Sequence, residues 1–261
     1  MALCVVVCYA QIADIIPSSV SIANTGTAYT ARWTAFQNPA TLVQEEQWQA
    51  DLQYENKFLS KVLHTASVQA ANCNKYVNVG AGYTFFGYAG WNEMLATVVL
   101  SRSFGRFSLG VAADFIAIYA GNESGYRCTA VPQLGMTVLL TRKLTLGFQM
   151  MNPFLQSLKL EDDIKRELPS IYSLGLDWAF IEKMRLAVQV DYDVNDTFRA
   201  AIGYEWQPLT EFGIKAGCSY RKYFIPAFGV DLRFSYFTFD ITAEWHPVLG
   251  VNLYGRIGFS K

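Results

Sequence analysis

The residues that could do chemistry in this chain are few and widely spaced. The chain has two histidines, His64 and His246, and neither falls in a His-Glu-x-x-His or Gly-x-Ser-x-Gly motif. Asp240, Glu244 and His246 share one parity along a predicted strand, which places their side chains on one face. That grouping would suit an acid–base site near a barrel rim, but a ladder of inward charges beside a loop histidine explains it more simply. We therefore expect that the protein is not an enzyme and has no catalytic residue.

Cysteines and acidic residues give no stronger signal. Two of the five cysteines lie in an N-terminal apolar run, and the other three are far apart without a Cys-x-x-Cys pair: Cys73, Cys128 and Cys218. The acidic run Glu161–Asp163 could bind a cation, although a solvated loop is the simpler interpretation. Glycine-containing stretches such as GVNLYGRIG precede no helix and are not phosphate loops. The sequence thus predicts no metal site and no cofactor.

The elements that would carry these residues are β-strands. In RLAVQVDYDV, residues 185–194, apolar side chains alternate strictly with small, polar or charged ones. Period-two alternation is typical of a strand with two unlike faces. Reading the chain in this way predicts about 14 strands separated by short turns. They lie near 46–59, 63–73, 75–88, 92–104, 105–120, 124–142, 143–153, 168–181, 183–194, 196–207, 210–223, 225–235, 236–246 and 250–260.

Composition limits what can cover the apolar faces. Hydrophobic residues make up 52% of the 261 residues and charged residues only 16%, yet no apolar run is long enough for a membrane-spanning helix. A net charge of −1 gives no reason to expect a nucleic-acid partner. Two classes remain: a large soluble β-protein, such as a sandwich or a lipocalin-type barrel, and a barrel in an outer membrane.

The charged faces favour the membrane barrel. In the C-terminal half they carry both signs of charge among Gly, Ala and Ser, which suits a crowded barrel interior. These expected lumen charges are Arg199, Glu205, Lys215, Asp231, Arg233, Asp240, Glu244 and Arg256. Aromatic residues near the ends of the apolar faces resemble an interfacial girdle: Tyr204, Trp206, Tyr220, Tyr236 and Trp245. We therefore predict an all-β, transmembrane, antiparallel up-and-down barrel of about 14 strands with outer-membrane lipid around it.

The N-terminal region divides into two further parts. Residues 1–10 contain the apolar run ALCVVVCYA and resemble a signal peptide that lacks its basic start, which predicts export. Residues 11–45 alternate poorly and contain Asn38-Pro39, a pair that interrupts strand pairing. We expect a short hatch or plug segment at 11–45 and the barrel at 46–261. If the N-terminus is periplasmic, the tight turns lie on the periplasmic side of the membrane and the long connection near 154–167 lies on the external side.

Several stretches resemble one family of outer-membrane proteins. FQNPATL is followed, in order, by LPSIYSLGLDW, AAIGYEW, GIKAGCSYRKYFIPAFGVDL and FTFDITAEWHPVLG. This order is similar to the barrels grouped with the long-chain fatty acid transporters, and most similar to the small PorV/PorQ-like branch associated with type IX secretion. The resemblance implies a hatch motif at Asn38, Pro39, Ala40 and Leu42 and a last hairpin loop with His246, Pro247 and Gly250. Thr41 stands where the family motif has glycine.

Two functions are compatible with these features. The resemblance implies an integral protein of a Gram-negative outer membrane, either a transporter-like barrel for a small hydrophobic compound or a scaffold that docks a secretion or assembly partner. We favour the transporter at the level of the family. The lumen charges of the C-terminal half argue against a passage that is apolar throughout. The short external loops leave little room for a lipid-capture groove.

Overall fold

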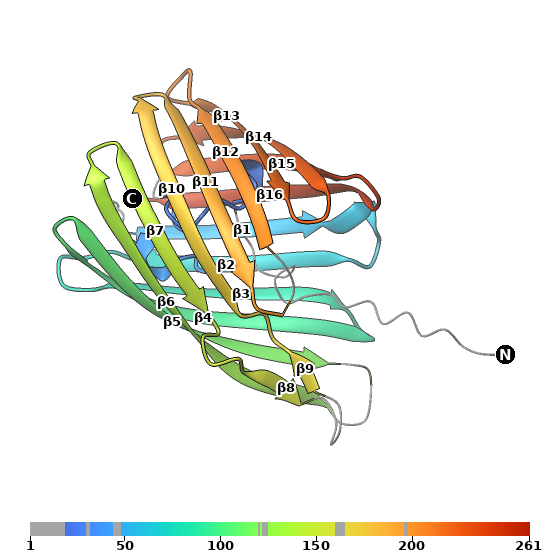
Figure 1. Ribbon diagram of the computed structural model, residues 1–261. Coiled ribbons are helices and arrows are strands. Elements are labelled where there is room, and N and C mark those ends of the chain that lie inside the picture. Colours follow the sequence, from blue (N-terminus) through green and yellow to red (C-terminus); the bar gives the residue numbers. More distant parts are fainter. Residues whose placement is uncertain are drawn as a thin grey trace.

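The barrel wall consists of fourteen antiparallel strands joined into one closed sheet (Figure 1). The computed structural model describes residues 19–29, 32–43, 48–119, 121, 125–159, 165–195 and 198–261. The expected signal segment 1–10 and the acidic run 161–163 lie outside these residues. The predicted all-β barrel and its strand number are therefore confirmed. In the described part of the chain, no helix has the length and apolar character needed to cross a membrane.

The wall strands follow one another in chain order. Their bounds are β1 (Trp48–Asn56), β2 (His64–Asn72), β3 (Asn78–Tyr88), β4 (Trp91–Phe104), β5 (Phe107–Tyr119), β6 (Tyr126–Thr141), β7 (Leu144–Met151), β10 (Ile171–Ile181), β11 (Met184–Asp193), β12 (Phe198–Trp206), β13 (Phe212–Tyr220), β14 (Phe224–Phe234), β15 (Phe237–His246) and β16 (Gly250–Ser260). The barrel closes where β1 pairs with β16, and the amide of Trp48 donates to the carbonyl of Lys261 at 3.0 Å. Closure leaves no unpaired sheet edge.

The two ends of the barrel differ in their connections. At the end that holds Lys261, neighbouring strands are joined by short turns such as 105–106, 142–143 and 182–183. The longest connection, 152–170, lies at the opposite end and contains a small two-stranded sheet of β8 (Ser157–Lys159) and β9 (Lys165–Glu167). The expected difference between the ends is present, whereas the β8–β9 sheet is an addition that strand periodicity did not predict.

The two faces of the wall carry the residues that alternation assigned to them. On β14, Leu232 is 41% exposed on the outside, and its neighbour Asp231 is fully buried inside. Outward aromatic side chains gather near the strand ends, including Tyr220, Tyr236 and Trp245. On β14 the wall is apolar outside and polar inside, which is the arrangement of a transmembrane barrel.

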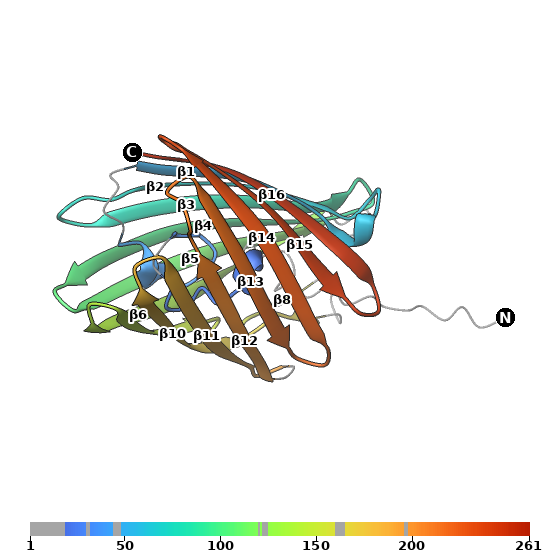
Figure 2. The ribbon, with the colours of Figure 1, turned by 90° about the horizontal axis from the view of Figure 1, so that it is seen from above.

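The N-terminal segment, defined here as the described residues 19–29 and 32–43, runs inside the barrel and forms none of its strands (Figures 1 and 2). It contains two single-turn 3-10 helices, η2 (Val20–Ile22) and η3 (Pro39–Thr41). The first packs against β12–β15 and the second against β4–β6. The segment therefore crosses the lumen and contacts the inner face of the wall on two opposite sides of the barrel.

Candidate functional site

Asn38 fastens the second half of the N-terminal segment. Its side-chain amide donates to the carbonyls of Thr27 at 2.6 Å, Phe148 at 3.2 Å and Met136 at 3.3 Å. Its side-chain oxygen accepts from the amide of Ala40 at 3.0 Å and so caps η3. Pro39 begins that turn, where its missing N–H costs nothing. The Asn-Pro pair thus ties the segment to itself and to the backbones of β6 and β7.

Leu42 completes the Asn38–Leu42 motif. Its side chain is fully buried, and its carbonyl accepts hydrogen bonds from Asn78 at 2.7 Å and Ser101 at 2.5 Å. Ala40 and Thr41 are buried as well. The motif residues therefore lie together inside the lumen, where each contacts the segment or the wall; that they act as a hatch stays a prediction.

Glycines on the inner face make room for the segment. Directly opposite pairs of glycines occur on three pairs of neighbouring strands, and each pair meets a different part of the segment: Gly110 and Gly135 meet Pro39 and Ala40, Gly147 and Gly175 meet Thr27 and Ala28, and Gly203 and Gly217 meet Ile22 and Ala23. A Cβ atom at Gly110, Gly147 or Gly203 would overlap backbone atoms of the segment. These paired glycines mark the track along which the segment lies.

One half of the lumen carries a large apolar cluster, beside buried polar side chains such as Glu93 and Asp114. Trp33, Phe36 and Leu42 of the segment pack into a cluster of inward-facing side chains that β3–β6 and the long connection supply. The wall contributes Phe86, Leu95, Val99, Ala112, Ile116, Ile118 and Val131, and the connection contributes Leu158 and Leu168. Trp33 is fully buried, and its ring occupies the space that a side chain at Gly80 would take. The segment thus covers an apolar inner wall.

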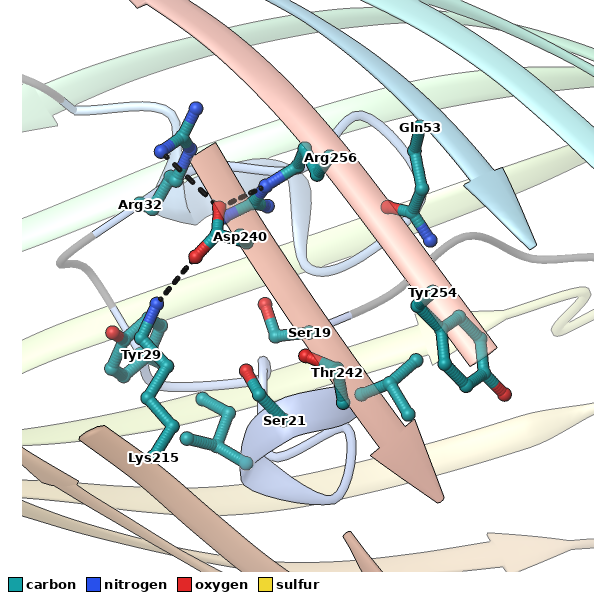
Figure 3. A pocket seen from close by; sticks show the side chains of 12 residues that line it. Ser19, Ser21, Tyr29, Arg32, Gln53, Lys215, Asp240, Thr242, Tyr254 and Arg256 are labelled. Carbon is teal, nitrogen blue, oxygen red and sulfur yellow. Dashed lines mark hydrogen bonds and ion pairs between the residues drawn. The ribbon is translucent and has the colours of Figure 1, made fainter. Parts of the chain in front are cut away.

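The other half of the lumen is charged. Asp240 of β15 lies between Lys215 at 3.0 Å and Arg256 at 2.9 Å (Figure 3). Arg32 of the segment reaches the same carboxylate at 3.7 Å and also pairs with Asp51 of β1. Each of these five charges has an opposite charge beside it, which offsets the cost of its removal from water. The ion pairs both fill this half of the lumen and hold the segment there.

Two further groups of charges fasten the first part of the segment. Tyr29 donates to Glu205, whose other oxygen accepts from Arg233 at 3.1 Å, and Arg233 also pairs with Asp231 at 2.9 Å. Separately, Arg199 pairs with Asp191 and donates to the backbone carbonyl of Ala23. Of the eight expected lumen charges, all point inward, and seven belong to ion pairs.

Glu244 is the exception, and it is also separated from the other members of the possible acid–base group. It accepts hydrogen bonds from Asn252 at 2.9 Å and Tyr254 at 3.3 Å. The ring nitrogen Nδ1 of His246 accepts from the amides of Val248 and Leu249 in the following turn. Asp240, Glu244 and His246 are therefore each engaged with different partners and form no common site.

The rest of the last hairpin loop also has a structural role. His246 pairs with Gly250 across the loop, and Gly250 takes a positive φ of 105°, which favours glycine. Pro247 lies in the intervening turn. Cys128 and Cys218 are free thiols. Among the described residues, no group of three His, Cys, Asp or Glu side chains is placed to hold a metal ion.

A small cavity remains between the segment and the charged half of the wall. Figure 3 shows its lining, in which Ser19, Ser21 and Arg32 face Lys215, Asp240 and Arg256. Its volume is about 30 Å³, and a single water needs roughly 10–15 Å³. The cavity therefore has room for about two waters. In this arrangement the cavity is too small for an organic ligand.

Sequence reasoning missed the partners of the lumen charges on the segment. Tyr29, Arg32 and Trp33 were not singled out, because no local pattern encodes their contacts with the wall: Glu205 for Tyr29, and Asp51 and Asp240 for Arg32. The inward positions of the strand glycines were the signal that could have found the track. A glycine in the middle of a strand often marks a close approach of another backbone.

Comparison with known proteins supports the fold. No protein-family model and no curated protein sequence matches the chain. Among solved structures, the Pseudomonas putida toluene transporter TodX matches with a TM-score of 0.66 and 13% identity over 92% of this chain and 95% of that one. A deltaS2S3 mutant of TodX, described as a monoaromatic hydrocarbon channel, has a TM-score of 0.71 at 13% identity, over 94% of this chain and 98% of that one.

A third similar structure is a Pseudomonas aeruginosa FadL homologue, with a TM-score of 0.67 and 11% identity over 90% of this chain and 93% of that one. At such low identity, the likeness concerns the fold. The expected relation to the PorV/PorQ-like branch is not among these findings and stays a prediction. The chain has the barrel fold seen in TodX and in the FadL homologue.

Proposed function

We propose that this protein is an outer-membrane channel for small hydrophobic compounds and that its N-terminal segment is the plug. The observation that carries the proposal is the cover that Trp33, Phe36 and Leu42 place over an apolar inner wall. A segment that leaves this position uncovers an apolar surface inside the barrel. Such a surface lowers the free energy of an apolar solute relative to water.

The unequal halves of the lumen suggest the class of solute. The wall from β3 to β6 offers Phe86, Leu95, Val99 and Ile116 to a passing molecule. Across the lumen, ion pairs such as Lys215–Asp240 make the wall charged, which is unfavourable for an apolar solute. A small apolar molecule would therefore travel along the β3–β6 side. The hydrocarbon channels of the same fold are consistent with a solute of this class.

Deletion of the plug tests this function. Removing residues 25–42 takes away Trp33 and Asn38 but leaves all fourteen wall strands intact. We expect a barrel that still inserts into vesicles and now lets toluene and small polar solutes enter faster than the intact protein does. Slow, heat-dependent changes in gel mobility of both proteins would show that each barrel is closed.

The same deletion separates the transporter from the scaffold. A scaffold with a permanently filled lumen, such as a component of a secretion complex, would lose barrel stability or a partner without becoming leaky. A folded deletion variant with unchanged permeability to both kinds of solute would therefore contradict the channel and favour the scaffold. The location is tested separately, since the mature protein should fractionate with the outer membrane and require detergent for extraction.

A further inference from the structure

Three loops lie near one another at the end of the barrel opposite Lys261 (Figure 2) and are linked by ring contacts. They are the β1–β2 loop (57–63), the β13–β14 turn (221–223) and the β15–β16 turn (247–249). The ring of His246 lies at their centre, 6.3 Å from the ring of Phe58 and 5.4 Å from that of Tyr223. The three loops therefore present one continuous surface, called here the loop cluster.

Both histidines of the chain hold this surface in shape. Nδ1 of His64 is 2.9 Å from the hydroxyl of Tyr54, and its Nε2 is 2.6 Å from the carbonyl of Lys61. His246 clamps its own turn through the amides of Val248 and Leu249. The amide of Phe58 donates to the side-chain oxygen of Asn252 on β16. The exposed side chains of the cluster thus stand on a fixed backbone.

The tips of the loop cluster are apolar. Val248 is 66% exposed and Leu249 is 54% exposed, while Leu59 in the neighbouring loop is 62% exposed. Just below these tips, the outward faces of the strands end in aromatic side chains such as Tyr54 and Trp245. The apolar tips are therefore continuous with the outward apolar band of the barrel, which faces acyl chains if the proposed membrane location holds.

The charge of the loop cluster has one sign. The three loops contain Lys57, Lys61, Arg221 and Lys222 and no Asp or Glu. Lys57 lies near Glu55 at 3.7 Å and is largely buried, so the exposed positive charge comes mainly from Lys61 and Lys222. At the other end of the same strands, the turns 73–77 and 207–211 carry one Lys and one Glu. Positive charge beside apolar tips complements a lipid that has both phosphate and acyl chains.

We infer that the loop cluster binds an anionic membrane lipid whose phosphate headgroup has a net negative charge, with the phosphate against Lys61 and Lys222 and the acyl chains against Leu59 and Val248. This inference rests on the proposed membrane location but not on the channel activity. The rigid backbone limits the entropy lost on binding, because the loops are already ordered by His64 and His246. A lipid bound there would fix how deeply the barrel lies in the membrane, and how it tilts, on the side that bears the loop cluster.

Lipid binding by the full-length protein tests the inference. The protein is held in a neutral detergent and titrated with phosphatidic acid or phosphatidylcholine of the same acyl chains, and retained lipid is counted by native mass spectrometry. Each lysine at a membrane surface contributes about fivefold to the affinity for anionic lipid. Lys61→Gln with Lys222→Gln should therefore weaken phosphatidic acid binding by on the order of 30-fold.

A matched variant controls for net charge. Lys75→Gln with Lys183→Gln removes the same charge from exposed turns at the other end, and it should leave binding unchanged. Leu59→Ser with Val248→Ser should weaken binding of both lipids but not of inorganic phosphate. Equal binding of the two lipids by the intact protein, or equal losses in the two lysine variants, would overturn the inference and leave the channel untouched. Failure of the intact protein to enter any bilayer would overturn the membrane location itself.

Discussion

Replacement of Arg32 by methionine should release the N-terminal segment. Arg32 is the segment's own cation in the charged half, where it pairs with Asp51 and lies 3.7 Å from Asp240. Asp240 keeps Lys215 and Arg256 after the change, so the loss falls on Asp51, which is 4% exposed. Asp51 keeps two amide donors, Gln49 at 2.7 Å and Gln69 at 2.9 Å, and the more distant charge of Arg256.

The magnitude follows from the burial of that carboxylate. Removing one partner of a buried ion pair costs about 3–5 kcal/mol. Because the Arg32 side chain is 17% exposed, we use the lower end of this range. In the released state, Asp51 faces water, so the cost applies to the closed state alone. About 3 kcal/mol corresponds to a change on the order of 100-fold in the ratio of released to closed protein.

Thiol labelling measures this ratio. Ala28 is 1% exposed inside the barrel, and Ala28→Cys in a background without the native cysteines should react with a maleimide only when the segment is released. Arg32→Met should raise the labelling rate by on the order of 100-fold, and adding Asp51→Asn should reverse much of the increase. Arg106→Met removes an exposed arginine from a tight turn and serves as the control. Labelling that is unchanged by Arg32→Met, or raised equally by Arg106→Met, would refute the reasoning.

Two further predictions concern packing and the outer face. Trp33→Ala should destabilise the closed position of the segment by about 3–5 kcal/mol, because it removes the side chain at the centre of the apolar half. The thiol of Ala28→Cys should then label faster, with little change in the heat stability of the wall. Leu232→Arg places a charge on the outward face and should impair membrane insertion by on the order of 2–4 kcal/mol, whereas Arg233→Leu should insert normally and disturb only the contacts with Glu205 and Asp231. Equal insertion defects in the last two variants, measured by folding into vesicles, would mean that the faces are misassigned.

The wall could be predicted because its strands alternate cleanly. The range 236–246 expected from sequence agrees closely with β15 (Phe237–His246), and 183–194 agrees with β11 (Met184–Asp193). Lipid-facing and lumen-facing residues alternate along such strands, so burial on one face is visible in the sequence. The β8–β9 sheet was not predicted, since each strand has only three residues and lies in a charged stretch where alternation is absent.

The apolar half of the lumen could not be recognised in the sequence, because its strands have apolar residues on both faces. On β4, Leu95 and Val99 point inward while Val98 and Leu100 point outward, so both faces read as apolar. The partners of the segment were hidden for another reason. Contacts such as Tyr29 with Glu205 join residues 176 positions apart, and no local pattern encodes a pairing of that range. The charges of the C-terminal half were visible, but their partners on the segment were not.

A reversible lock on the segment tests the central claim most directly. A Cβ at Gly175 would lie 3.4 Å from Cβ of Ala28, near the roughly 3.5–4.5 Å found in disulfides. In a background without the native cysteines, Ala28→Cys with Gly175→Cys should join the segment to β10 under oxidising conditions. Entry of toluene into vesicles should then be blocked, and a reductant should restore it to the level of the two single variants. Equal entry before and after reduction, with the disulfide shown to form, would contradict a plug that moves.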